Sequence, residues 1–382
     1  MIDIYSYDMV PLSDFLAEYK ELNTNNRFRP VAVGRYGIRT RESIYSKELA
    51  QDYSKNKLIY KDTLTVGMGS VQMDIGILTD DITYSVSPAY HTYRINGINC
   101  DYLRFCLQAR NADMFERYKK RGSRQGKSID LKAWLHYLIP VYEIDGQLQI
   151  VSTLHKIQSI SDDRMQQLQK LDDLVKARFV EMFGTLDNPA RQFEYFTLKE
   201  LCSKITDGKH GGCIQESGTQ RYFVGAREIY DDEVHYDTAP EISIADFEKD
   251  YKRCNLEIGD FLIVNTGATI GKSAIASDYR TEKTLLQKSV ALLKVKRELL
   301  DPVFLQWCYR VNANMYMVES ASAQPNLLLS KINSTKIYVP EIELQSQFSS
   351  FVQQVDKSKF VVQQALDKAQ LLFDSLMQQY FG

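Results

Sequence analysis

A glycine-rich stretch at residues 267–273, Gly-Ala-Thr-Ile-Gly-Lys-Ser, comes nearest to a site for chemistry. A phosphate-binding P-loop has the pattern G-x-x-x-x-G-K-[ST], with a loop long enough for its amides to surround a phosphate. The present stretch is one residue shorter than that pattern. It therefore predicts a glycine turn between two strands, in which Lys272 would touch a backbone phosphate if DNA binds there.

No other combination of residues predicts a catalytic centre. Residues 301–304, Asp-Pro-Val-Phe, approximate an adenine methyltransferase motif but lack its second proline. Residues 66–69 weakly suggest a cofactor loop, but they are not part of a recognisable Rossmann unit. The five histidines have no metal-ligand spacing, and the six cysteines never form C-x-x-C. We therefore predict no catalytic residue, no metal and no cofactor in this chain.

The composition is that of a globular protein, with 25% charged and 44% hydrophobic residues. No run of about 18 apolar residues is present, so the sequence predicts no membrane span. The first residues lack the basic and apolar regions of a secretory signal. Scattered cysteines without a disulfide spacing are typical of reduced compartments, so we expect a cytoplasmic protein.

The net charge of −2 does not favour nucleic acid as a partner, but the charge is unevenly distributed. Residues 1–140 sum to +4, and the positive charge concentrates in residues 117–132. Residues 228–250 are strongly acidic. Binding of DNA would therefore need local basic patches or basic partner proteins.

The chain contains an internal repeat at a shift of 198 residues, which relates residues 139–184 to residues 337–382. Such repeats report on the architecture before any single motif does. Both copies end in Phe-Gly, and glutamines match at two positions of each copy. The matched glutamines are Gln147 with Gln345 and Gln149 with Gln347.

Each copy of the repeat is predicted to form a helix about 55 Å long, because apolar residues recur alternately four and three positions apart. The seam has a polar break at the same place in both copies, Ser161 and Lys359. A long helix with an apolar stripe needs a partner, and we expect the two copies to pair antiparallel as a coiled coil. Two unrelated helices, each packed on its own domain, are the alternative. The predicted seam residues are Ile150, Leu154, Ile157, Leu168, Leu171 and Val175 in the first helix, and Val352, Val355, Val362, Leu366, Phe373 and Leu376 in the second.

The segments before the two helices also look duplicated, since both contain short apolar strands, glycine turns and a short helix. The predicted fold class is α+β, with two mixed α/β domains separated by two long antiparallel helices and a pseudo-two-fold internal repeat. We expect a first recognition domain at residues 1–146, a long helix at 147–184, a linker at 185–190, a second recognition domain at 191–340 and a second long helix at 341–382.

With these features the sequence resembles the specificity subunit of type I restriction–modification systems. The second domain carries the resemblance best, in residues 206–212 (TDGKHGG), 258–275 (IGDFLIVNTGATIGKSAI) and 324–345 (QPNLLLSKINSTKIYVPEIELQ). The duplicated helix completes the pattern, so the resemblance covers nearly the whole chain. The first domain departs more, because no aspartate-glycine-x-histidine turn appears near residue 30.

The resemblance implies a non-catalytic subunit that reads two DNA half-sites around a fixed nonspecific spacer, with the helix pair setting the distance. It also implies two methyltransferase subunits and two restriction subunits as partners. These partners, and not this chain, would bind S-adenosylmethionine, ATP and Mg²⁺. A coiled-coil scaffold that binds only proteins, and a nucleotide-dependent enzyme built on the short glycine loop, are the competing hypotheses.

Candidate DNA contacts are polar or basic residues at predicted turns, where arginine, glutamine and asparagine can pair with base edges and lysine with phosphates. In the first domain they lie in the basic run, which could equally be a solvated helix face. The candidates are Arg121, Arg124, Gln125 and Lys127 in the first domain, and Lys209, His210, Arg221, Arg227, Asn265, Lys272, Gln324 and Asn326 in the second.

Overall fold

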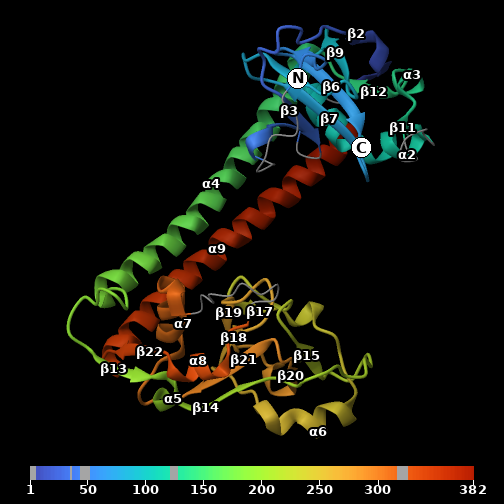
Figure 1. The fold of residues 1–382 in the computed structure, drawn as a ribbon. Helices are drawn as coiled ribbons and strands as arrows, with labels where there is room; N and C mark the ends of the chain where they lie inside the picture. The colour runs from blue at the N-terminus through green and yellow to red at the C-terminus, as the bar shows by residue number, and fades with distance from the viewer. Residues whose placement is uncertain (1–5, 35–36, 44–51, 121–127, 316–325) are drawn as a thin grey trace. The chain divides into compact units, whose positions relative to one another are not determined.

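The structure is a computed structural model that describes residues 6–34, 37–43, 52–120, 128–315 and 326–382. The chain divides into two compact units, one of Met1–Met165 with Gln363–Gly382 and one of Gln166–Val362. This division passes through both long helices. Each unit therefore contains one mixed domain and a part of each helix (Figure 1).

The first unit is built around a four-stranded antiparallel sheet with the strand order β2-β9-β6-β7. Leu64 and Val66 alternate along β6 and pack on one face of the sheet together with the helices. A second, smaller cluster that includes Val31 and Leu78 involves strands outside this sheet. Because apolar side chains are needed on both faces, β6 is buried along nearly its whole length.

The elements of the first domain alternate short strands with short helices. In chain order they are β1 (Asp8–Pro11), β2 (Leu16–Tyr19), β3 (Val31–Gly34), β4 (Gly37–Thr40), β5 (Lys57–Ile59), β6 (Thr63–Met68), β7 (Met73–Leu78), β8 (Tyr84–Val86), β9 (His91–Ile95), α1 (Cys100–Ala109), α2 (Asn111–Tyr118), β10 (Lys119–Lys120), β11 (Ser128–Ile129), α3 (Leu131–Trp134) and β12 (Leu138–Val141).

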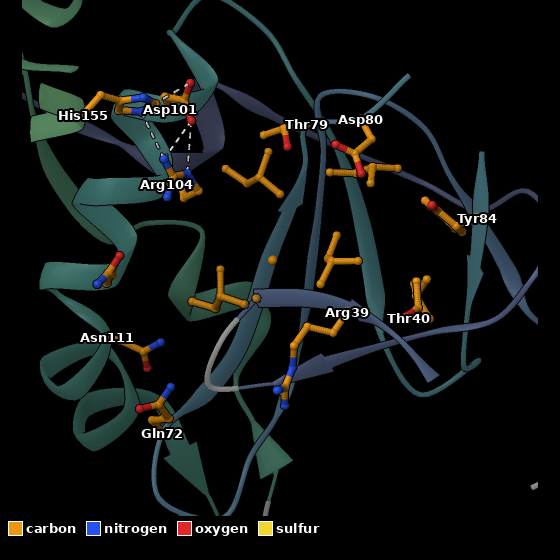
Figure 2. Close-up of a pocket in the computed structure, with 18 residues that line it drawn as sticks. Arg39, Thr40, Gln72, Thr79, Asp80, Tyr84, Asp101, Arg104, Asn111 and His155 are labelled. Carbon is orange, nitrogen blue, oxygen red and sulfur yellow. Dashed lines mark hydrogen bonds and ion pairs between the residues drawn. The ribbon is translucent and has the colours of Figure 1, made fainter. Parts of the chain in front are cut away.

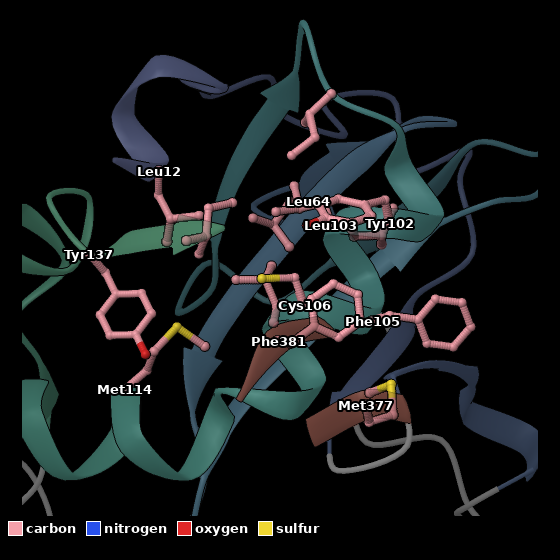
Figure 3. Close-up of a cluster of buried hydrophobic side chains, with 14 of the residues drawn as sticks. Leu12, Leu64, Tyr102, Leu103, Phe105, Cys106, Met114, Tyr137, Met377 and Phe381 are labelled. Atoms are coloured by element: carbon pink, nitrogen blue, oxygen red, sulfur yellow. The ribbon is translucent and has the colours of Figure 1, made fainter. Parts of the chain in front are cut away.

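The helix α1 connects the sheet of the first unit to the end of the C-terminal helix α9 (Ile342–Phe381). Figure 3 shows Phe381 and Met377 of α9 beside Tyr102, Phe105 and Cys106 of α1. The ring centres of Tyr102 and Phe381 are 5.2 Å apart. The end of α9 is thus part of the core of the first domain.

The second unit repeats this plan, with a sheet of order β14-β21-β18-β19. An aromatic cluster joins the helix α7 to both long helices, because Phe304 of α7 contacts Phe179 of α4 and Phe348 of α9 lies against Phe179 as well. The elements are β13 (Glu194–Thr197), α5 (Leu198–Leu201), β14 (Cys202–Asp207), β15 (Tyr222–Val224), β16 (Ile229–Tyr230), β17 (Glu233–Val234), α6 (Ile244–Cys254), β18 (Phe261–Val264), β19 (Ser273–Ile275), β20 (Thr284–Leu286), β21 (Val290–Val295), α7 (Pro302–Val311), α8 (Leu329–Ser334) and β22 (Lys336–Val339).

The shift of 198 residues extends from the helices into the sheets. It converts β12 into β22 at both ends, and it brings β6, β7 and β9 onto β18, β19 and β21. The short helix before each long one departs from it, because α7 begins 202 residues after α1. The duplication therefore includes the sheet core, and insertions are confined to the segments around it.

The two long helices, α4 (Ile144–Phe183) and α9, contain 40 residues each. In the first unit the beginning of α4 and the end of α9 share one core, and in the second unit the end of α4 and the beginning of α9 share the other. The helices are therefore antiparallel. The predicted fold class, two mixed domains joined by two long antiparallel helices with an internal repeat, is confirmed.

The predicted seam residues differ in burial along the helices. Those near the helix ends are buried, whereas those near the middle are half-buried, as is Leu376. The buried group is Ile150, Leu154, Ile157, Val175, Val352, Val355 and Phe373, and the half-buried group is Leu168, Leu171, Val362, Leu366 and Leu376.

The strict heptad fails at the last turns of both helices. It placed Arg178 in the seam, but Arg178 is exposed and Phe179 is buried instead. The same slip occurs in the second copy, where Met377 and Phe381 are buried. A straight α-helix has 3.6 residues per turn, so a seam of period 3.5 drifts off the contact line unless the pair supercoils. The sequence argument imposed the shorter period over too many turns.

The polar break of the second helix is satisfied across the helix pair. The ammonium of Lys359 lies 2.7 Å from the carboxylate of Asp172 on α4, within the second unit. Its counterpart Ser161 instead donates a hydrogen bond of 3.1 Å to the carbonyl of Ile157 in its own helix. The break is thus charged in one unit and neutral in the other.

All six cysteines are free thiols. Burial raises the pKa of Cys106 and Cys308 to about 12, which is expected of inert core thiols. Within the part of the chain that the structure describes, no helix has the length and apolar character required to span a membrane.

Candidate nucleic-acid interface

The connections at one end of the second sheet gather the side chains that could meet DNA. At this end β14 and β18 finish, at Asp207 and Val264, and their antiparallel neighbours β21 and β19 begin. The parallel pair β15 and β20 finishes beside them, because the amide of Gln287 donates to the carbonyl of Val224. We call residues 207–212, 225–228, 265–272, 287–289 and 326 the second-domain edge.

The aspartate-glycine-x-histidine turn of this edge is fixed against its neighbour strand. The amide of Lys209 donates to the carbonyl of Leu286 over 2.7 Å, and a side chain at Gly208 would overlap that carbonyl. Asp207 pairs with Arg253 and accepts a hydrogen bond of 3.2 Å from the ring of His210. His210 itself remains largely exposed, which leaves it accessible to a ligand.

Lys209 points into the domain and is already paired. Its ammonium lies 2.7 Å from the carboxylate of Asp250 and 3.5 Å from that of Asp246 on α6. The hydrogen bond to Asp250 raises the pKa of Lys209 above its ordinary value. Its charge is therefore compensated internally, and the geometry gives it a structural role.

Three exposed cations on the second-domain edge have no acidic partner among the described residues: Arg227, Lys272 and Lys288. Lys272 closes the glycine turn, since its carbonyl accepts from the amide of Val264 and the hairpin uses the nearby amides itself. The predicted turn between strands is thus what the structure has. Sequence reasoning missed Lys288. The signal was its place directly before β21, because antiparallel neighbours begin and end at the same edge.

The two asparagines of this edge differ in access. Asn265 is buried, and its carbonyl accepts from the amide of Leu327 over 2.7 Å, so it holds the edge together. Asn326 is exposed and accepts a hydrogen bond of 3.2 Å from the hydroxyl of Thr266. Of the two, only Asn326 presents a side chain to solvent.

The structure separates the remaining candidates from this group. Arg221 precedes β15 at the opposite end of that strand, where its guanidinium stacks on Phe247 and donates to the carbonyl of Gln220. Arg121, Arg124, Gln125, Lys127 and Gln324 lie outside the described residues.

The equivalent edge of the first sheet has a different chemistry. Shifted by 198 residues, Lys272 corresponds to Asp74, and Lys288 corresponds to Tyr90. Burial raises the pKa of Asp74, and Tyr90 is held by its hydroxyl, which donates to the carbonyl of Val33 over 2.9 Å. The hairpin β10–β11, which carries the basic run between its strands, lies against β6 of the same sheet.

A cavity of about 880 Å³ opens in the first unit between the hairpin β3–β4, the strand β7 and the helix α1. Figure 2 shows Arg39 across the opening from Asp101, Arg104 and His155. Arg104 lies 2.9 Å from Asp101, so these charges largely compensate one another. Nowhere in the described ranges do three or more His, Cys, Asp or Glu side chains form a metal-binding group.

The motif that approximated a methyltransferase signature has a structural role. Asp301 is the N-cap of α7, where its carboxylate accepts from the amides of Val303 and Phe304, and Pro302 occupies the first helical turn. Aspartate followed by proline is a common start for a helix.

Comparison with known proteins identifies this arrangement. Residues 190–368 match the family model of the "Type I restriction modification DNA specificity domain", so the second domain is a DNA specificity domain. Among solved structures, the chain is similar to the S subunit of a type I restriction–modification system from M. genitalium. That match has 13% identity and a TM-score of 0.54, and it covers 100% of this chain and 98% of the other.

A second solved structure, described as the structural basis of complex assembly and conformational transition of the type I R-M system, matches with 16% identity. Its TM-score is 0.61, with 98% of this chain and 97% of the other covered. No curated protein sequence matches the chain. The chain belongs to the specificity subunits of type I restriction–modification systems, which recognise DNA and are not themselves catalytic.

Proposed function

We propose that this specificity subunit reads a bipartite DNA target, one half-site with each domain, across a spacer of fixed length. The observation that carries the proposal is the duplicated sheet with two chemically different edges. A shared scaffold would present both domains to the duplex in the same way, whereas Asp74 and Lys272 at matched positions would favour different contacts.

The partners would supply the chemistry. We expect two methyltransferase subunits, which bind S-adenosylmethionine and modify adenine, and two restriction subunits, which use ATP and Mg²⁺. The long helices support this proposal, because they expose apolar side chains such as Phe360 and Leu371 that a partner could cover. The assembly would act in the cytoplasm. A scaffold without DNA specificity stays the alternative, and it would not co-purify with a methyltransferase.

Sequencing of methylated adenines tests the proposal. The chain is expressed with the methyltransferase encoded beside it, in a host without other adenine methylation. The expected result is one motif made of two short defined parts around a run of undefined bases. A contiguous motif, or no methylation although the complex forms, would reject the proposal.

A further inference from the structure

Two buried glutamines occupy matched positions in the two copies of the repeat. Gln147 lies in the first turns of α4 and is 3% exposed, and Gln345 lies at the same place in α9 and is fully buried. A buried amide has to be satisfied by hydrogen bonds on both its oxygen and its nitrogen. Their partners therefore show what each glutamine holds.

Gln147 joins three pieces of the first unit. Its Nε2 donates to the carbonyl of Tyr142 over 2.8 Å, across the short connection between β12 and α4. Its Oε1 accepts from the amide of Asn99 over 3.0 Å. Asn99 is the N-cap of α1, since its side chain accepts from the amide of Tyr102.

Gln345 makes the same connections in the second unit, with one bond more. Its Nε2 donates to the carbonyls of Pro340 and Leu299, over 2.7 Å and 3.0 Å. Its Oε1 accepts from the amide of Asp301 over 2.8 Å, and Asp301 is the N-cap of α7. In both units one amide thus ties the start of the long helix to the start of the short helix that lies on the sheet.

The bonds cross the place where each domain could pivot. A strand leads directly into each long helix, β12 into α4 and β22 into α9, through a connection of two residues. Without a lateral tie, rotation about such a short connection would tilt the helix relative to the sheet. The glutamine provides that tie, because its partners lie on the domain and on the connection itself.

We propose that Gln147 and Gln345 are positioning residues that fix the angle of each domain on its long helix and thereby set the spacer length. This inference rests on the proposed function. Successive base pairs are about 3.4 Å apart along the duplex, so a small tilt at the joint moves a reading edge by one base pair. A domain that tilts keeps its edge intact and therefore keeps its half-site.

Replacement of Gln345 by methionine tests the inference, because methionine has a similar volume and cannot form the three hydrogen bonds. Methylated-adenine sequencing of the complete system is the readout, with each variant expressed from the same operon. We expect Gln345→Met to keep both half-sites. The ratio of methylation at spacers one base pair longer or shorter to methylation at the native spacer should rise at least tenfold.

Gln347→Met is the matched control, since Gln347 is exposed two residues further along the same helix. It should keep the native spacer ratio. Gln147→Met makes the same test in the first unit, where two bonds are lost instead of three, and serves if Gln345→Met does not fold. Gln147→Glu retains an acceptor for the Asn99 amide, so it should relax the spacer less than Gln147→Met.

An unchanged spacer ratio in a folded Gln345→Met or Gln147→Met complex would overturn the inference. So would an altered half-site, which would make the glutamine part of the reading surface. A uniform fall in methylation at every site would mean that the glutamines only stabilise the fold. A wild-type motif without two parts would instead defeat the proposed function, and the wild-type sample shows this independently of the variants.

Discussion

The two sheets have the same strand order and nearly the same spacing in sequence, yet their edges differ in charge. The second-domain edge presents Lys272 and Lys288, and the matched positions of the first domain are Asp74 and Tyr90. The strands that build the core tolerate little change because their side chains interdigitate at high density. The connections at the edge are free to vary. The comparison shows one scaffold used twice with separate recognition surfaces.

The largest effect should come from a charge in the shared helix seam. Val355→Asp and its counterpart Ile157→Asp both place an unpaired carboxylate at a buried position, which should cost about 3–5 kcal/mol of unfolding free energy. Denaturant titration measures the loss. Similar losses would support the equivalence of the two helix parts. If Val355→Asp left the spacer preference unchanged, the helix pair would not set the distance between half-sites.

Removal of the edge cations should weaken DNA binding without affecting the fold. For Lys272→Ala with Lys288→Ala we expect a loss of affinity on the order of tenfold or more at 0.15 M salt, because each phosphate contact contributes about 0.9 to the salt slope. Affinity measured over a range of salt concentrations gives that slope. Lys199→Ala, an exposed lysine on α5, is the control. A slope that stays at the wild-type value would place DNA elsewhere.

The ion pair at the polar break should contribute little. In a double-mutant cycle with Lys359→Leu and Asp172→Asn, we expect a coupling of about 0.5 kcal/mol, since both side chains are partly exposed. The coupling should shrink in 1 M salt, where the screening length is about 3 Å. A coupling that persisted in high salt would mean that the pair is shielded from solvent.

Asp74 should give the smallest effect, with a definite dependence on pH. Burial raises the pKa of Asp74 in the folded state, so its ionisation costs stability as the pH rises through that pKa. Asp74→Asn should therefore unfold at slightly higher urea concentration at neutral pH. The gain should vanish in acid, below the pKa of the unfolded chain. An equal gain at both pH values would point to a cause other than charge.

The parts of this architecture that repeat could be predicted from the sequence, because periodicity and duplication report on burial. The long helices, their antiparallel pairing and the strands around the glycine turn follow from patterns of apolar residues. The seam failed at Arg178, where an imposed period of 3.5 ignored the natural drift of a straight helix.

The candidate interface was less predictable. Turn position alone does not show whether a polar side chain turns outward, as the contrast between Lys209 and Lys272 demonstrates. Lys209 is paired with Asp250, which lies far away in the sequence, and Lys288 joins the edge through sheet pairing. Both facts depend on tertiary contacts that local composition does not encode.

Binding of duplexes in which one half-site is scrambled tests the central claim, that each domain reads its own half of a split target. The complex with the methyltransferase is titrated with the native duplex, with each singly scrambled duplex and with a doubly scrambled one, at fixed salt. We predict that either single scramble weakens binding by at least a hundredfold, since each wrong base pair costs about 1–3 kcal/mol. Scrambling of one half without any loss of affinity would contradict the claim.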